Sequence, residues 1–292
     1  LTYLVGADKT YAATIRLGME TTTEDAEGEV TTAHGCRIDD LPEDRLQEAL
    51  SGLTGVIQQV PSAVSAIKVD GVRAYKRVRD GQDVELEARP VTIHDLRPVG
   101  EPRQAGVDLA GAAAGGVSTG AEADGAEGEV QVVDLDVVVS CSSGTYVRAL
   151  ARDLGRTLGC GAHLIALRRT GVGPFDVGQA HTLTALSEQV ETDAATPDPR
   201  GVTTVPLEEV ARRCFERLDL TEAEARGLRF GQPLDVAALE RAQSPVGNAV
   251  PVASKEAPGQ RVVAGFAPDG RLVALLTPRG SRARPVLVLD PA

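Results

Sequence analysis

The stretch that most constrains the fold is a predicted strand that turns directly into an amphipathic helix. Residues 129–140 alternate apolar and polar side chains and then become a run of valines, a pattern typical of a strand. A Ser-Ser-Gly turn follows, after which apolar side chains from Val147 to Leu158 recur at the spacing of one helix face. We therefore predict a strand–helix unit whose helix lies within 145–158 and ends at Gly159.

The polar face of this helix carries arginines four residues apart, at positions 148, 152 and 156. An arginine in the first helical turn is unfavourable unless it faces a negative group, because the helix N-terminus is itself partially positive. Residues 140–175 hold five arginines against one acidic residue, in a chain whose net charge is −12. Two interpretations stay open here. One is a solvated stripe, and the other is a set in which Arg148 holds a carboxylate while Arg152 and Arg156 face phosphate.

The overall composition limits the classes of function. A net charge of −12 and an isoelectric point of 4.9 argue against nucleic-acid binding over the whole surface, so any such binding must be local. No apolar run approaches the roughly 20 residues of a membrane span. Four cysteines and four histidines lack the spacing of a zinc site, which favours reduced cysteines in a cytoplasmic protein without a metal.

A second basic segment lies at 68–80, where Lys68, Lys76 and three arginines surround Tyr75. A basic loop with one aromatic side chain is typical of proteins that hold an RNA backbone and stack on a base. The alternative is a solvated loop whose tyrosine is half-buried. We expect the segment to form part of a longer polar connection, 61–89.

Composition also predicts the domain boundaries. Residues 103–128 are rich in alanine and glycine and become acidic, so we expect a disordered insertion there. A polar segment with prolines at 191–200 is expected to be a linker. It separates a first domain, 1–190, from a small, mostly β domain, 201–292, in which a capping box opens a helix at Thr221.

Four blocks of sequence follow one another in a recognisable order. They are Asp8-Lys-Thr-Tyr11 with Arg16-Leu-Gly, Val60-Pro-Ser-Ala-Val-Ser-Ala-Ile-Lys68 with Gly71 and Tyr75, Ala88-Arg-Pro-Val, and Gly144-Thr-Tyr-Val-Arg148 with Gly159-Cys-Gly-Ala-His163 and Leu167-Arg-Arg169. This set resembles the TruB family of bacterial tRNA pseudouridine(55) synthases over residues 1–185, apart from the insertion. Residues 201–292 resemble, more weakly, the PUA-like RNA-binding domain of these enzymes.

The resemblance implies a fold, a reaction and a partner. The fold is α+β, with a mixed, mainly antiparallel sheet and flanking helices. The partner is the T-stem-loop of tRNA, bound by a monomer without metal, cofactor or membrane. In the reaction a uridine is flipped out of its stack, and an aspartate attacks it covalently. The base then detaches, rotates and rejoins through carbon as pseudouridine.

The resemblance also implies roles for single residues. Arg148 is expected to hold the nucleophilic aspartate in its ionised form, and Tyr11 to stack on the flipped base and serve proton removal. His163 is expected to be structural. The residues expected to line the pocket are Tyr146 and Leu167, and those expected to contact RNA are Lys68, Tyr75, Lys76, Arg152, Arg168 and Arg169.

The nucleophile of the family lies in a Gly-Xaa-Leu-Asp-Pro motif N-terminal to the Lys-Xaa-Tyr block, and here eight residues precede Lys9. We therefore expect a fragment, inactive alone, in which Arg148 is an unpaired charge at the mouth of an open cleft. Asp290, in a C-terminal Leu-Asp-Pro, is expected to be a tail residue. The alternative function is a non-catalytic protein that binds or folds tRNA with the same surface. A guide-RNA-dependent relative is disfavoured by the acidic charge.

Overall fold

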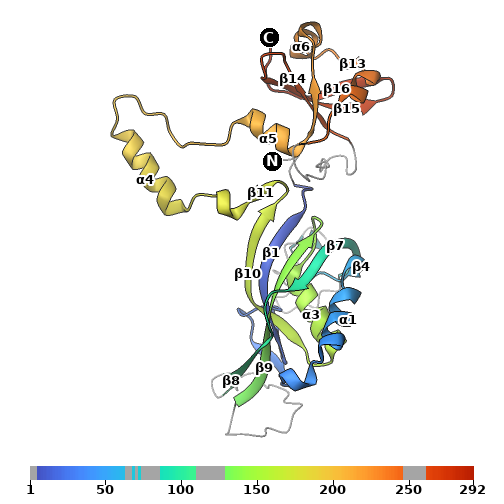
Figure 1. Cartoon of the computed structure of the whole chain (residues 1–292), viewed down its shortest axis with the longest axis vertical. Helices are drawn as coiled ribbons and strands as arrows, with labels where there is room; N and C mark the ends of the chain where they lie inside the picture. Colours follow the sequence, from blue (N-terminus) through green and yellow to red (C-terminus); the bar gives the residue numbers. More distant parts are fainter. Residues whose placement is uncertain (1–4, 63–67, 70–71, 74–85, 110–128, 246–260) are drawn as a thin grey trace. The chain divides into compact units, whose positions relative to one another are not determined.

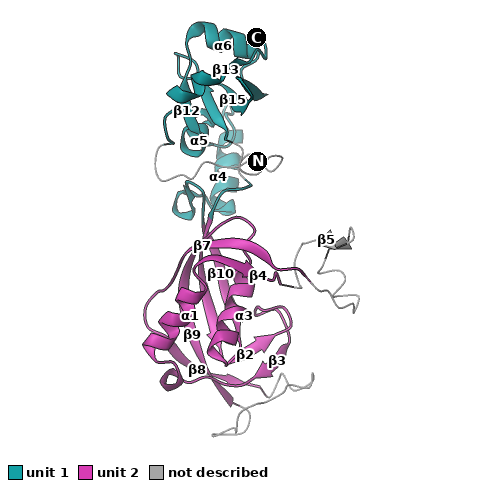
Figure 2. Ribbon diagram, turned by 90° about the vertical axis from the view of Figure 1, so that its right-hand side faces the viewer, with its two compact units in different colours: residues 1–8, 171–292 teal, residues 9–170 magenta. Residues whose placement is uncertain are grey.

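The computed structural model describes residues 5–62, 68–69, 72–73, 86–109, 129–245 and 261–292 (Figure 1). The chain forms two compact units, one of residues 9–170 and the other of residues 1–8 and 171–292 (Figure 2). The sequence predicts a linker at 191–200, but helix α4 (Leu183–Ala194) runs into that segment. Thr182 begins α4 by accepting a hydrogen bond from the Ala185 amide.

Seven strands form one sheet in the order β11-β10-β1-β9-β7-β4, with β8 also paired to β9. The strands are β1 (Lys9–Leu17), β4 (Gly55–Gln59), β7 (Arg89–Pro98), β8 (Arg103–Asp108), β9 (Glu129–Cys141), β10 (Ala162–Val172) and β11 (Phe175–Asp176). β1 and β9 run antiparallel, and Arg16 pairs with Asp134 across them at 2.7 Å. The strand predicted at 129–140 and the mainly antiparallel sheet are confirmed.

Two helices, α1 (Glu43–Gly52) and α3 (Val147–Leu158), lie on one face of this sheet and enclose the core (Figure 2). Every second residue of β9 from Val133 to Val139 is buried in that core, because side chains alternate along a strand. α3 ends as predicted at Gly159, whose φ of 76° is left-handed. The helix begins at Val147, so Arg148 is its second residue.

The segment between β1 and α1 contains a hairpin. β2 (Met19–Thr21) pairs with β3 (Val30–Ala33), and residues 22–29 form the connecting loop. A short 3-10 turn, η1 (Ile38–Asp40), follows, and a small hairpin of β5 (Lys68–Val69) and β6 (Val72–Arg73) lies further along. The β2–β3 loop reaches α3, which is more than a hundred residues away in sequence, and this contact builds the site described below.

The other unit contains a five-stranded sheet in the order β12-β14-β15-β16-β13. Its elements are η3 (Val177–Gln179), α4, α5 (Leu207–Cys214), β12 (Glu216–Asp219), α6 (Glu222–Arg229), β13 (Leu234–Asp235), η4 (Val236–Arg241), β14 (Val263–Phe266), β15 (Leu272–Arg279) and β16 (Arg282–Val288). The capping box between Thr221 and Glu224 is confirmed. Asp290 pairs with Arg229 at 2.8 Å, and its expected role as a tail residue stays a prediction.

One expectation about the insertion is wrong. Residues 103–108 form β8, which pairs antiparallel with β9, and Ala105 and Val107 pack against the buried Val132. The remainder of the insertion, 110–128, lies outside the described residues. Within the described ranges, no helix is both long and apolar enough to cross a membrane.

Candidate active site at the start of helix α3

Asp25 lies in the loop between β2 and β3 and is fixed there by its neighbours. The Thr23 hydroxyl donates a hydrogen bond to Asp25 Oδ1 at 2.5 Å, and the Glu27 amide donates to the same oxygen at 3.1 Å. The Thr21 hydroxyl donates to the Asp25 carbonyl at 2.7 Å. An aspartate that accepts from the amide two residues later stabilises a tight turn. The turn occupies Oδ1 and leaves Oδ2 facing α3.

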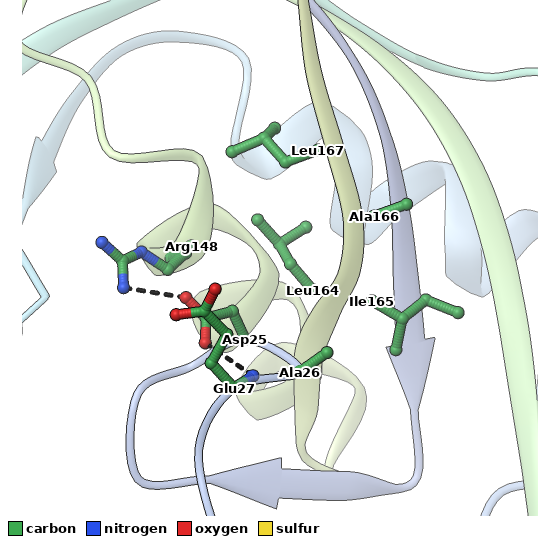
Figure 3. Close-up of a pocket in the computed structure, with 8 residues that line it drawn as sticks. All are labelled: Asp25, Ala26, Glu27, Arg148, Leu164, Ile165, Ala166 and Leu167. Atoms are coloured by element: carbon green, nitrogen blue, oxygen red, sulfur yellow. Dashed lines mark hydrogen bonds and ion pairs between the residues drawn. The ribbon is translucent and has the colours of Figure 1, made fainter.

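Arg148 is the partner of Asp25 Oδ2. Its Nη1 donates to Oδ2 at 2.9 Å (Figure 3). The same nitrogen donates to the Thr23 carbonyl at 3.4 Å. The two side chains are 29% and 23% exposed, so the pair is partly shielded from water. The expectation that Arg148 is unpaired in this chain is therefore wrong. Asp25 supplies the negative group that an arginine in the first helical turn requires.

A pocket of about 370 Å³ opens beside this ion pair. It is lined by Asp25, Ala26 and Glu27 of the loop, Arg148 of α3, and Leu164, Ile165, Ala166 and Leu167 of β10. Leu164 and Leu167 lie on the side of β10 that faces Arg148, whereas Ile165 points to the other side (Figure 3). The loop is tied to β10, because the Leu164 amide donates to the Glu24 carbonyl at 3.1 Å. The pocket thus has one charged wall and one apolar wall, and Leu167 lines it.

Arg152 occupies a different position from the one expected of a phosphate contact. Its side chain is only 12% exposed and pairs with Glu24 at 2.8 Å and with Asp153 at 2.9 Å. Its Nη2 also donates to the Val60 carbonyl at 2.8 Å. A guanidinium whose edges already face two carboxylates and a carbonyl is not presented to RNA. We therefore correct the assignment of Arg152 from an RNA contact to an internal ion-pair residue.

Tyr11 and Arg169 meet across the neighbouring strands β1 and β10. Burial raises the pKa of the Tyr11 phenol, while a hydrogen bond with the Arg169 side chain acts in the opposite direction. Tyr146 precedes α3, and its backbone exchanges two hydrogen bonds with the Gln59 side chain. Neither tyrosine lines the 370 Å³ pocket, so the roles expected for Tyr11 and Tyr146 stay predictions.

The structure describes only some of the other residues that are expected to contact RNA. Arg168 and Arg169 have exposed side chains on β10, directly after the pocket residue Leu167. Lys68 belongs to the short strand β5, whereas Tyr75 and Lys76 lie outside the described residues. A phosphate contact by any of these residues stays a prediction.

His163 is buried, and its expected structural role stays a prediction. Its Nδ1 lies 3.0 Å from the Met19 carbonyl, to which it donates a hydrogen bond. Burial lowers the pKa of this imidazole. In the part of the chain that the structure describes, no cluster of three or more His, Cys, Asp or Glu side chains could hold a metal ion.

Sequence reasoning missed Asp25 and its neighbour Glu24. Both fall in a run of polar and acidic residues, and such runs are usually solvated. The available signal was local: Thr23, Asp25 and Gly28 have the composition of a tight Asx turn. That composition predicts an ordered turn with a fixed carboxylate, although it does not say what the carboxylate faces.

Three family models match the chain. The TruB family pseudouridylate synthase N-terminal domain matches residues 1–110, the tRNA pseudouridylate synthase B C-terminal domain matches 148–211, and the tRNA pseudouridine synthase II C-terminal model matches 245–290. Curated proteins named tRNA pseudouridine synthase B from Arthrobacter sp. (strain FB24) and Paenarthrobacter aurescens (strain TC1) are 45% and 44% identical to it. Each match covers 100% of this chain, and 80% and 78% of the relatives, respectively. The chain belongs to the TruB family.

Solved structures share the fold of this TruB-family chain. A crystal structure of a Cbf5-Nop10-Gar1 complex matches with a TM-score of 0.60 at 19% identity, over 99% of this chain and 68% of that chain. The structure of an H/ACA RNP bound to a substrate RNA containing 2′-deoxyuridine matches with a TM-score of 0.56 at 18% identity, over the same shares. The α+β fold expected of a TruB-family chain is thus confirmed.

Proposed function

We propose that this TruB-family chain catalyses the isomerisation of uridine to pseudouridine in tRNA, at position 55 of the T-loop. The single observation that carries the proposal is the ion pair of Arg148 and Asp25 beside the pocket of β10. One apolar wall and one charged wall suit a planar, polar base that has been flipped out of its stack. Membership of the TruB family supports the reaction class, an isomerase.

The chemistry of this isomerisation balances within the substrate. The bond between ribose C1′ and base N1 breaks, and a bond between C1′ and C5 forms. C5 loses a proton and N1 gains one, so no electrons are added or removed. The pocket's task is therefore to hold the base while it rotates, and Leu164 and Leu167 provide an apolar surface for it.

Arg148 is able to hold a second carboxylate in addition to Asp25. Its described hydrogen bonds both use Nη1, whereas a guanidinium has five donor hydrogens. Nε and Nη2 can then donate hydrogen bonds to the nucleophilic aspartate of the family's Gly-Xaa-Leu-Asp-Pro motif. An adjacent cation lowers the pKa of a carboxyl group and so keeps this aspartate ionised. Asp25 fixes the orientation of the guanidinium that does this.

The tRNA partner is proposed to bind as its T-stem-loop to a monomer in the cytoplasm. The exposed Arg168 and Arg169 support the RNA contact, because they continue the strand that lines the pocket and so place positive charge next to a flipped nucleotide. Tyr11 lies against Arg169 and is proposed to stack on the base and to serve the proton-removal step.

The test joins residues 1–292 to an N-terminal segment of a relative that carries the Gly-Xaa-Leu-Asp-Pro motif. T-stem-loop RNA is incubated with this extended chain, and pseudouridine at position 55 is detected by mass spectrometry. We expect conversion by the extended chain. We expect binding without conversion by residues 1–292 alone, because their sequence lacks the motif.

The control is the extended chain with asparagine in place of the motif's aspartate, which should bind the RNA and leave it unmodified. If the extended chain binds the RNA but forms no pseudouridine, the catalytic proposal is refuted. That result would favour the alternative, a non-catalytic protein that binds or folds tRNA.

A further inference from the structure

Two consecutive acidic residues face two arginines that lie one helical turn apart. Glu24 pairs with Arg152 at 2.8 Å, and Asp25 pairs with Arg148 at 2.9 Å. Residues four apart on a helix lie on the same face. The two ion pairs therefore lie side by side and both join the β2–β3 loop to α3. A loop held at two adjacent points cannot rotate about either one, so its register against the helix is fixed.

The backbone of Glu24 makes this double contact possible. Side chains of consecutive residues in an extended chain point to opposite sides, so two neighbouring acids cannot both reach one helix from an extended segment. Glu24 has a φ of 61°, in the left-handed region that side chains other than glycine rarely adopt. Its amide donates to the Thr21 carbonyl at 3.1 Å, and its carbonyl accepts from the Leu164 amide.

Arg152 connects this loop to two other parts of the site. Its Nε donates to Asp153 on its own helix, and its Nη2 donates to the Val60 carbonyl, which follows β4. One guanidinium therefore joins the loop that carries Asp25, the helix that carries Arg148 and the chain just after β4. Both Arg152 and Glu24 are largely buried, at 12% and 16% exposure, so the pair is little screened by water.

The pair also carries local features that are unfavourable for stability. Besides its left-handed backbone, Glu24 has one carboxylate oxygen, Oε2, that is buried without a hydrogen-bond partner among the described residues. Burial of an unsatisfied polar atom and a left-handed φ in a glutamate both disfavour the folded state. Glu24 is therefore better explained by its effect on the position of the neighbouring Asp25 than by a contribution to the stability of the fold.

We propose that Glu24 and Arg152 are positioning residues that hold Asp25 against Arg148 and thereby orient the Arg148 guanidinium for the isomerisation. The inference rests on the proposed function, because orientation of Arg148 matters only if Arg148 serves the reaction. Glu24 and Arg152 touch neither the substrate nor the reacting atoms, and they act through the Asp25–Arg148 pair.

The test compares Glu24→Gly, Arg152→Gln and the double variant in the extended chain described above. Glycine accepts the left-handed backbone at this position, so Glu24→Gly keeps the fold and removes only the side chain. The matched control is Arg103→Gln, which removes an exposed ion pair with Asp136 in the same unit. Multiple-turnover kinetics on T-stem-loop RNA give kcat and KM, and single-turnover kinetics show whether the isomerisation step is the one affected.

We expect each single variant to lower kcat by about tenfold to a hundredfold, the loss that a small misplacement of a reacting group produces. KM should be nearly unchanged, and the double variant should be no slower than the slower single variant, because the two residues act as a unit. Arg152→Lys should recover part of the loss, since it keeps the charge but not the three-way contact. A kcat equal to that of the Arg103→Gln control in folded Glu24→Gly would overturn the proposal.

A second measurement is independent of turnover and uses residues 1–292. Amide hydrogen exchange of residues 21–29 should become faster in Glu24→Gly and in Arg152→Gln, and stay unchanged in Arg103→Gln. Unchanged exchange in that loop would refute the positioning role even if the extended chain proved inactive. Loss of pseudouridine formation in the unsubstituted extended chain, with the exchange effect present, would instead refute the proposed function alone.

Discussion

His163 shows how burial sets the charge of a single residue in this chain. Burial lowers its pKa from the usual 6.5, and its Nδ1 donates to the Met19 carbonyl. The unfolded chain therefore takes up a proton near pH 6.5 that the folded chain does not yet bind. Because the unfolded state binds more protons, the free energy of unfolding falls as the pH drops below 6.5.

Substitution of this histidine should remove that part of the pH dependence. His163→Asn keeps a donor near the Nδ1 position but does not titrate. When the pH is lowered from about 7.5 to about 5.5, we expect the free energy of unfolding to fall less in the variant than in the parent. Urea unfolding of residues 1–292 at both pH values measures this. A parallel loss in both proteins would show that His163 is not protonated on unfolding in this range.

The site could be predicted from the sequence only for residues whose role is visible locally. The amphipathic pattern identified Arg148 as a residue that needs a negative partner, and the structure confirms that need. Its partner Asp25 lies 123 residues earlier, and nothing in a loop of polar residues indicates which helix the loop will meet. Arg152 was assigned to phosphate for the same reason, because the spacing of arginines does not reveal buried partners such as Glu24.

At the scale of elements, α3 and β10 pack so closely that one helical glycine has no room for a side chain. A Cβ on Gly155 would clash with the Gly161 carbonyl carbon and the Ala162 backbone nitrogen, because both lie closer than van der Waals contact allows. The chain returns onto the helix at this point because Gly159 and Gly161 both have left-handed φ values, 76° and 71°. This close approach sets where β10 starts and hence where its pocket residues lie.

Gly155→Ala should therefore be destabilising, although alanine normally favours a helix over glycine. We expect a loss of about 1–3 kcal/mol in the free energy of unfolding, because the backbone of β10 must shift. The control is Gly52→Ala at the end of α1, where a Cβ would meet nothing within 4 Å. It should be neutral or stabilising by up to about 1 kcal/mol. Equal effects of the two substitutions in urea unfolding would contradict the packing argument.

Elements with a strong side-chain pattern were predicted well, and those held by backbone pairing were not. α3 and β9 follow clear periodicities, and both were placed within two residues of their observed bounds. β8 was missed because its one alanine and one glycine resemble the Ala/Gly-rich segment that follows it, whereas its place is set by antiparallel hydrogen bonds to β9. Composition describes what a segment can bury, whereas pairing with a neighbouring strand depends on the rest of the sheet.

At the scale of the whole molecule, the chain is acidic overall but carries positive charge beside the pocket. The net charge is −12, yet the strand that lines the pocket continues into the exposed Arg168 and Arg169. A polyanion is repelled by the average surface and attracted locally, which favours binding in one orientation. Phosphate contacts release counterions, so the salt dependence of binding reports how many such contacts form.

Arg168→Ala with Arg169→Ala should weaken binding of T-stem-loop RNA and flatten its salt dependence. Two lost phosphate contacts lower the slope of log Kd against log salt by about 1.5. Filter binding by residues 1–292 at several salt concentrations measures the slope, with Arg97→Ala as an exposed arginine control. Arg168→Ala alone separates binding from any effect on Tyr11, which lies against Arg169. An unchanged slope would show that these arginines do not contact phosphate.

The central claim is that Arg148, oriented by Asp25, serves the chemical step rather than RNA binding. The most direct measurement is the single-turnover rate of pseudouridine formation by Arg148→Gln in the extended chain, together with its Kd for T-stem-loop RNA. We predict a rate at least about 100-fold lower than in the parent, the usual loss on removal of a fixed electrostatic group, with a smaller loss in Asp25→Asn and unchanged Kd in both. An unchanged rate, or a loss of affinity as large as the loss of rate, would contradict the account.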